Sequence, residues 1–276
     1  MEAIALALGA SLTWGLADFF GPLRGRVLGA LRALVYVQVG GLLGIALIVA
    51  VRGKGPEGSL ALLAIPAAVS GTLGLFAYYN GIAVGAISIV APIAGISAIV
   101  PVIVGIASGD RPSALQLLGI ACALIGVFLA AREPGRAGTR FAAGVGLAML
   151  AAVGFGGYFP FMHAAGDADF WWASLIFRMT STTMILATLA VQRPPLAVPG
   201  RVLPWLALIG LGDMFGNLLY AASASSGLVS ITSVLASLYP IVTVVLARIV
   251  LSERVARLQE AGIGLTLAGV ALISAG

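Results

Sequence analysis

The stretch "GDRPSALQLLGIACALIGVFL" (residues 109–129) returns in the second half of the chain as "LSERVARLQEAGIGLTLAGVAL" (residues 251–272). At one constant spacing the matched positions are Asp110 with Glu253, Arg111 with Arg254, Gly119 with Gly262 and Gly126 with Gly269. Upstream the spacing shortens by a single residue and then by another, as short insertions or deletions in loops would produce. We therefore predict two copies of one unit, residues 1–135 and 136–276.

The composition predicts the medium in which the two units fold. Hydrophobic residues make up 61% of the chain and charged residues only 9%, whereas a soluble globular domain carries about 25% charged residues. Apolar runs of about 18 or more residues recur along the chain, and each is long enough to cross a bilayer as a helix. The sequence thus predicts an all-α polytopic membrane protein surrounded by the lipid bilayer. The net charge of +5 comes from arginines scattered through short loops, so we expect no nucleic-acid partner.

Polar breaks divide the chain into about ten predicted transmembrane helices. These spans lie near residues 3–21, 31–51, 60–81, 84–108, 113–131, 141–163, 170–192, 203–223, 227–250 and 256–275. Each unit then holds five spans, and an odd number makes the second copy enter the membrane from the opposite side. Two such inverted five-helix repeats are typical of secondary transporters, whose substrate site lies near the bilayer midplane between the repeats.

Three short motifs resemble those of a known family. They are "ASLTWGLADFF" (residues 10–20), the arginine Arg32 in "ALRAL", and "LSER" (residues 251–254) after a proline-bearing ninth span. Together with the paired five-span units, they resemble the EamA-type transporters of the drug/metabolite transporter superfamily. Asp110 departs from the family pattern, which commonly has Glu there, but keeps the charge. The resemblance implies a secondary carrier with a central cavity between two inverted halves. Many members export amino acids and other small metabolites.

These features predict a secondary active transporter, an exporter or exchanger, rather than an enzyme. We expect a small-molecule substrate such as an amino acid, alternating access around the central cavity, and a place in the inner membrane of a bacterial cell. Protons are the candidate coupling ion, and we expect neither a cofactor nor a metal. The alternative is a proton-coupled exporter of cationic drugs, because a carboxylate inside the membrane could bind cations and protons in turn.

An acidic residue in an apolar span marks the predicted substrate site. Asp213 lies near the middle of the span 203–223, where a charge costs roughly 2.5–3.5 kcal/mol on insertion scales. Gly210, Asp213, Asn217 and Tyr220 share one face of a helix, which we expect to point inward. Asp213 then either contacts substrate or protons, or is tied to an arginine or the backbone for structure. In the first case Asp213→Asn lowers transport and leaves folding intact.

Other residues complete the candidate substrate site. Trp14 and Asp18 share a face of the first span, where Asp18 could instead be solvated or pair with Arg24 or Arg32. The repeat aligns Asp213 with Thr72 and Asp18 with Phe159, so each carboxylate belongs to one half only. The further candidate substrate contacts are Tyr78, Tyr79, Ser97 and Tyr239.

Two arginines and three prolines are the candidates for structural or gating roles. Arg178 lies inside the seventh span, where it could pair with Asp213 or Asp169, and Arg32 is its predicted counterpart in the first half. Proline removes a helical hydrogen bond and frees a backbone carbonyl. The prolines of the fourth and ninth spans therefore predict bends, either gating or static, at Pro92, Pro101 and Pro240.

The letters "GLGD" (residues 210–213) also spell the GxGD motif of intramembrane aspartyl proteases. That chemistry needs a second aspartate close enough to share a proton. The Tyr-Asp pair and the Pro-Ala-Leu motif of those enzymes are missing, since Asp18 follows Ala17. An intramembrane protease is therefore a remote alternative.

The side of the membrane that holds the termini stays open at this point. Most loop arginines fall on the side opposite the termini, and cytoplasmic loops carry the excess of basic residues. The count therefore favours termini outside, whereas the family resemblance favours termini in the cytoplasm.

Overall fold

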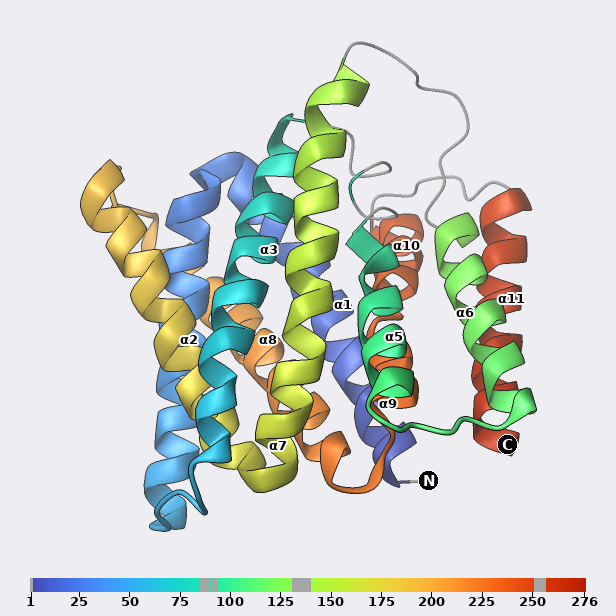
Figure 1. Cartoon of the computed structure of the whole chain (residues 1–276). Coiled ribbons are helices and arrows are strands. Elements are labelled where there is room, and N and C mark those ends of the chain that lie inside the picture. The colour runs from blue at the N-terminus through green and yellow to red at the C-terminus, as the bar shows by residue number, and fades with distance from the viewer. Residues whose placement is uncertain (1, 85–89, 91–93, 131–139, 251–256) are drawn as a thin grey trace.

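The computed structural model is a bundle of helices (Figure 1) and describes residues 2–84, 90, 94–130, 140–250 and 257–276; no strand occurs in those ranges. A helix satisfies its own backbone hydrogen bonds, as a chain in lipid must. The long helices are α1 (Glu2–Leu28), α2 (Ala30–Arg52), α3 (Ala64–Val84), α6 (Ala114–Ala130), α7 (Arg140–Gln192), α8 (Leu203–Ser223) and α11 (Arg257–Ala275). The shorter ones are α5 (Ile99–Ala107), α9 (Val229–Ala236), α10 (Tyr239–Val250) and the 3-10 turns η1 (Leu60–Leu63), η2 (Ile96–Ala98), η3 (Gly200–Val202) and η4 (Ala224–Ser226).

Five helical stretches are long and apolar enough to cross a membrane. They are Glu2–Gly25, Ala30–Arg52, Leu60–Val84, Gly146–Gln192 and Gly200–Ser226. The predicted class, an all-α multi-pass membrane protein, is therefore confirmed. The stretch Gly146–Gln192 covers the predicted sixth and seventh spans, and the fifth, ninth and tenth spans fall on shorter apolar helices. Part of the fourth span lies outside the described residues, so the count of ten crossings stays a prediction.

Helix α7 consists of two arms that meet at Asp169. The stretch Gly146–Gln192 has 47 residues, about 70 Å of helix, more than twice the ~30 Å hydrocarbon core of a bilayer. Asp169 has extended backbone angles (φ −162°, ψ 95°), and its Oδ1 accepts hydrogen bonds from the amides of Trp171 (3.1 Å) and Trp172 (3.2 Å). Its side chain thus caps the second arm. The sequence predicts a loop between the spans 141–163 and 170–192, but in the structure only Asp169 interrupts the helix there.

Helix α1 runs further than the sequence predicts. The expected break in "PLRGR" (residues 22–26) is helical, and α1 ends only at Leu28, before Gly29. Gly29 has φ 94°, a left-handed conformation that favours glycine. Polar residues at the end of a membrane helix need not end it, because its backbone bonds continue into the interface.

Pro101 of the fourth span and Pro240 of the ninth span each lie where a helix begins rather than in its middle. Pro101 lies in the first turn of α5 and Pro240 in the first turn of α10, where no intrahelical N–H bond is lost. The predicted ninth span is interrupted, because α9 ends at Ala236 and α10 begins at Tyr239. Pro92 lies outside the described residues. A gating role for these prolines stays a prediction.

Helices from the two halves of the chain pack against each other. Helix α3 contacts α7, α1 contacts α8, and α6 lies beside α11 at one edge of the bundle (Figure 1). At the α6–α11 crossing, a methyl group on Gly119 would lie 2.8 Å from the Gly269 carbonyl oxygen, and one on Gly126 would lie 2.7 Å from that of Gly262. Only glycine permits this close approach of two backbones.

Candidate functional site

A cavity lies among six helices and holds about 560 Å³ of empty space, including its open mouth. Helices α1, α2, α3, α7, α8 and α10 contribute to its wall. The lining residues are Trp14, Asp18, Gln38, Gly71, Thr72, Leu75, Phe155, Tyr158, Phe159, Phe177, Asp213, Asn217 and Tyr239. A concave, mostly apolar site with a few converging polar groups is typical of small-molecule binding.

Six of the thirteen residues that line the cavity are aromatic. Tyr158 packs edge-on against Trp14, with ring centres 5.8 Å apart, and against Phe177 at 5.2 Å. Phe155 and Tyr239 meet edge-on at 6.5 Å. Such contacts hold the rings in fixed orientations, so the wall presents ring faces and edges to a ligand.

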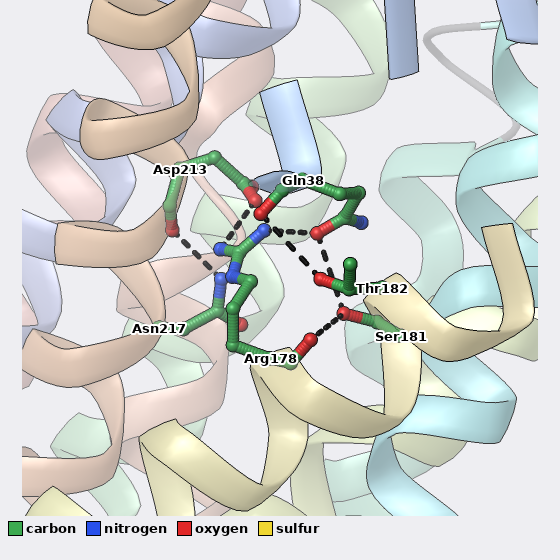
Figure 2. Close-up of polar contacts among 6 residues, drawn as sticks. All are labelled: Gln38, Arg178, Ser181, Thr182, Asp213 and Asn217. Carbon is green, nitrogen blue, oxygen red and sulfur yellow. Dashed lines mark hydrogen bonds and ion pairs between the residues drawn. The ribbon is translucent and has the colours of Figure 1, made fainter. Parts of the chain in front are cut away.

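Asp213 forms an ion pair at the edge of the cavity. Its Oδ2 lies 2.7 Å from Nη2 of Arg178, and Nη1 of Arg178 donates to Oε1 of Gln38 (Figure 2). The side chain of Arg178 is 1% exposed and that of Asp213 17%. A buried guanidinium needs a counter-ion, so Asp213 lines the cavity and also neutralises Arg178. Of the two partners predicted for Arg178, the structure selects Asp213.

The hydrogen bonds around Arg178 connect three helices. Ser181, one turn further along α7, donates to Gln38 Oε1 of α2 at 3.3 Å. On α8, Asn217 turns its amide back to the carbonyl oxygen of Asp213 at 2.7 Å (Figure 2). Close contact between α2 and α8 leaves room for the guanidinium only because residue 41 is glycine: a methyl there would lie 3.1 Å from Cζ of Arg178.

Asp18 has a different environment. Its carboxylate lines the same cavity and is partly exposed to it. Among the described residues it has no hydrogen bond and no ion pair. Arg32, a predicted partner, instead donates to the carbonyl oxygen of Ala197 at 3.4 Å, and Arg24 is exposed. Among the described residues, Asp18 therefore pairs with neither arginine, one of the alternatives that the sequence left open.

Four predicted substrate residues lie behind the cavity wall. The Tyr220 hydroxyl donates to the Phe159 carbonyl oxygen at 3.0 Å and shares a 2.7 Å hydrogen bond with Ser233. Tyr220 thus supports Phe159, which does line the cavity. The other three are also buried outside the lining: Tyr78, Tyr79 and Ser97. The predicted polar face on α8 correctly groups Asp213 and Asn217, which both line the cavity. Tyr220, about one turn further along the helix, lies beyond the cavity lining.

Eight lining residues were not predicted from the sequence. They are Gln38, Gly71, Thr72, Leu75, Phe155, Tyr158, Phe159 and Phe177. The internal repeat identifies three of them, because one and the same spacing relates Trp14 to Phe155, Asp18 to Phe159 and Thr72 to Asp213, and all six of these residues line the cavity. The repeat partners of the predicted residues would thus have identified these three further lining residues from the sequence.

The environment of Asp213 does not suit an aspartyl protease. Two catalytic aspartates share one proton because two like charges so close together cannot both ionise. Asp18 and Asp213 do line one cavity, but Arg178 already provides a cation to Asp213 at 2.7 Å. The "GLGD" spelling therefore lacks the electrostatics of that chemistry.

Comparisons with known proteins agree with this fold. No curated protein matches the chain. A solved structure titled "Crystal structure of protein" matches with a TM-score of 0.78 and 17% identity, over 99% of this chain and 98% of that one. The model of the EamA-like transporter family matches residues 1–132 and 142–275. Because the family model matches both segments and so nearly the whole sequence, the chain belongs to the EamA-like transporter family of the drug/metabolite transporter superfamily.

Proposed function

We propose that this chain is a secondary active carrier of small metabolites such as amino acids, working as an exporter or exchanger in the inner membrane of a bacterial cell. The substrate occupies the aromatic cavity, which opens in turn to either side of the membrane. Membership of a transporter family gives the general activity. The observation that carries the rest is that positions equivalent in the two sequence repeats line one cavity.

Two inverted five-helix repeats would explain that observation. A site on the pseudo-two-fold axis between such repeats receives equivalent positions from both copies. A second contact pattern supports the same arrangement. A methyl group on Gly15 would lie 2.9 Å from the carbonyl oxygen of Tyr239, and one on Gly156 would lie 2.9 Å from that of Ser97. The repeat matches Gly15 with Gly156. At a spacing one residue longer, it matches Tyr239 with Ser97. The same helix crossing therefore occurs once in each half.

Alternating access then follows from rocking of one repeat against the other. At these crossings a glycine on one helix lets the two backbones approach closely. The ion pair between Arg178 and Asp213 joins α7 to α8 across the cavity edge. A substrate ammonium or a proton that engages a cavity carboxylate changes the charge balance there, which couples occupancy to the movement.

The experiment is a counterflow screen in proteoliposomes against amino acids, nucleosides and cationic dyes at two pH values. We expect saturable exchange of at least one class. Leu75→Trp fills the cavity from α3 and should abolish exchange, whereas Leu73→Trp on the exposed face of the same helix should retain it. The proposal fails if the wild type exchanges nothing, or if the two tryptophan variants are equally active.

A further inference from the structure

We propose that one corner of the bundle binds the headgroups of anionic phospholipids. The end of α1, the start of α2 and the turn between α7 and α8 form this corner (residues 20–36 and 190–205), which we call the arginine corner. It lies outside the cavity, so the proposal is independent of the substrate. The partner is the lipid of the bilayer, through headgroups that carry a net negative charge.

The formal charge of the arginine corner is wholly positive. Its two segments contain five arginines and neither Asp nor Glu: Arg24, Arg26, Arg32, Arg193 and Arg201. The side chains of Arg24, Arg193 and Arg201 are exposed, and that of Arg32 is half-buried. Within the described part of the chain, these four side chains form no ion pair. An anionic lipid supplies the opposite charge that the corner itself lacks.

The turn after α7 lies across the start of α2. Arg32 donates from Nη1 to the carbonyl oxygen of Ala197 at 3.4 Å, and the Tyr36 hydroxyl donates to that of Leu196 at 2.8 Å. The end of α7 and the start of α2 accordingly lie at the same end of the bundle (Figure 1). Arginines that are far apart in the sequence therefore share one surface.

The end of α1 joins the same surface through an apolar cluster. Phe20 and Leu28 of α1 pack against this cluster together with Tyr36 of α2 and Val202 of η3. Arg24 lies one helical turn from both Phe20 and Leu28, so it shares their side of the helix. Three separate parts of the chain thus bring their arginines to one corner.

Exposed apolar side chains border these arginines. Val27 is 81% exposed, and Trp205, about one turn after Arg201, is 57% exposed. Tryptophan is enriched where a bilayer meets water, and an arginine can lay its aliphatic stem on apolar surface while its guanidinium reaches the headgroups. The planar guanidinium also suits the oxygens of a phosphate, which it binds in a bidentate manner.

The sequence repeat provides an internal comparison. The spacing that relates Trp14 to Phe155 also relates Leu28, where α1 ends, to Asp169, where α7 bends. The same spacing relates the arginine corner to residues 161–177 and 49–64, which we call the counterpart corner. The two corners are therefore equivalent in the repeat, and their charges can be compared directly.

The counterpart corner carries charges of both signs. It contains two basic and three acidic residues: Arg52, Lys54, Glu57, Asp167 and Asp169. The guanidinium of Arg52 lies over the ring of Trp171, 4.6 Å from its centre, and Asp169 accepts a 3.2 Å hydrogen bond from the amide of Glu57. An excess of carboxylates repels anionic headgroups. Of two equivalent corners, only the arginine corner therefore suits anionic lipid.

Lipid-dependent thermal unfolding of the purified full chain tests the proposal. The chain in a neutral detergent is titrated with phosphatidylglycerol or with phosphatidylcholine of the same acyl chains, and Tm is followed by intrinsic fluorescence. The concentration that gives half of the stabilisation should be about tenfold lower for phosphatidylglycerol, or lower still, because each basic residue near an anionic surface contributes about fivefold in affinity. This preference should fall in about 1 M salt, which screens exposed charges.

Three exposed arginines are replaced together to locate the effect. The variant with Arg24→Gln, Arg193→Gln and Arg201→Gln should lose most of the preference for phosphatidylglycerol, and the corresponding lysine variant should keep most of it, because the charge is retained. The matched control combines Arg52→Gln with Lys54→Gln in the counterpart corner. It should keep the preference of the wild type.

Equal effects of the two lipids on the wild type, or a glutamine variant with an unchanged preference, overturn the proposal. A control that loses the preference as fully as the glutamine variant does so too. Equal stabilisation by glycerol 3-phosphate would identify a site for a soluble phosphate, and binding of polyglutamate without a lipid preference would identify a protein-binding surface; either contradicts a lipid site. If the glutamine variant does not fold, the lysine variant decides, because a preference that persists in high salt contradicts the charge argument and one that salt removes supports it.

Discussion

The α6–α11 crossing and the central cavity relate the two halves of the chain in different ways. At the crossing, the contact of Gly119 with Gly269 recurs as the contact of Gly126 with Gly262, with the same residue type at every position. In the cavity, positions that correspond in the two repeats differ in chemistry. The carboxyl group of Asp18 corresponds to the phenyl ring of Phe159, and the hydroxyl of Thr72 corresponds to the carboxylate of Asp213. The scaffold is therefore repeated and the ligand-facing chemistry is not.

The physical reason is the number of side chains that each place accepts. Where two backbones touch, any side chain larger than hydrogen separates the helices, so both halves keep glycine. A cavity wall has no such restriction, and an asymmetric ligand favours different groups on its two sides. Substitutions at three places, the ion pair, the glycine crossing and the cavity wall, test the contrast.

The largest expected effect comes from breaking the asymmetric ion pair. Asp213→Asn leaves the buried Arg178 without its counter-ion, which should lower the free energy of unfolding by about 3–5 kcal/mol. This replaces the sequence-based expectation that the variant folds normally. Unfolding in detergent is followed by intrinsic fluorescence, with Asp167→Asn as the control.

A double-mutant cycle with Arg178→Gln sharpens this prediction. Removing both charges should cost less than the sum of the single losses, because no buried charge then lacks a partner. Additive losses would contradict the ion pair as the cause.

A smaller effect is expected from the symmetric crossing. Gly126→Leu overpacks the α6–α11 contact and should lower the free energy of unfolding by about 1–3 kcal/mol. Gly269→Leu should have a similar effect, because it disturbs the corresponding contact. The matched control is Gly264→Leu on α11, where an added methyl group meets nothing within 4 Å. If the three variants unfold alike, the crossing does not depend on glycine.

The smallest effect on stability is expected in the cavity wall. Thr72→Val replaces an unpartnered buried hydroxyl with a methyl group of the same shape, and stability should change by less than about 0.5 kcal/mol or rise. Exchange in the counterflow assay should weaken a few-fold, because the substrate loses a hydrogen-bond partner in the cavity wall. Thr183→Val is the control, since its exposed hydroxyl bonds only its own helix. Unchanged exchange by Thr72→Val would show that this hydroxyl does not contact the substrate.

Sequence patterns predict part of the site for a local reason. Trp14 with Asp18, and Asp213 with Asn217, each lie one helical turn apart, and helical periodicity places such pairs on one face. All four line the cavity. Periodicity gives no depth along the axis, however, and for this reason Tyr220 belongs to the same predicted face but lies behind the wall.

The amino-acid sequence by itself determines the all-helical membrane class, the family and the spacing that relates the two halves. These follow from apolar runs and local hydrogen bonding, which act within one helix. Only the tertiary structure decides that Arg178 neutralises Asp213 from 35 residues away, that Gln38 joins them from 140 residues away, and that Asp18 lacks a partner in the described chain. Such pairings depend on how separate helices dock. That docking sets which of two similar carboxylates is left for a ligand.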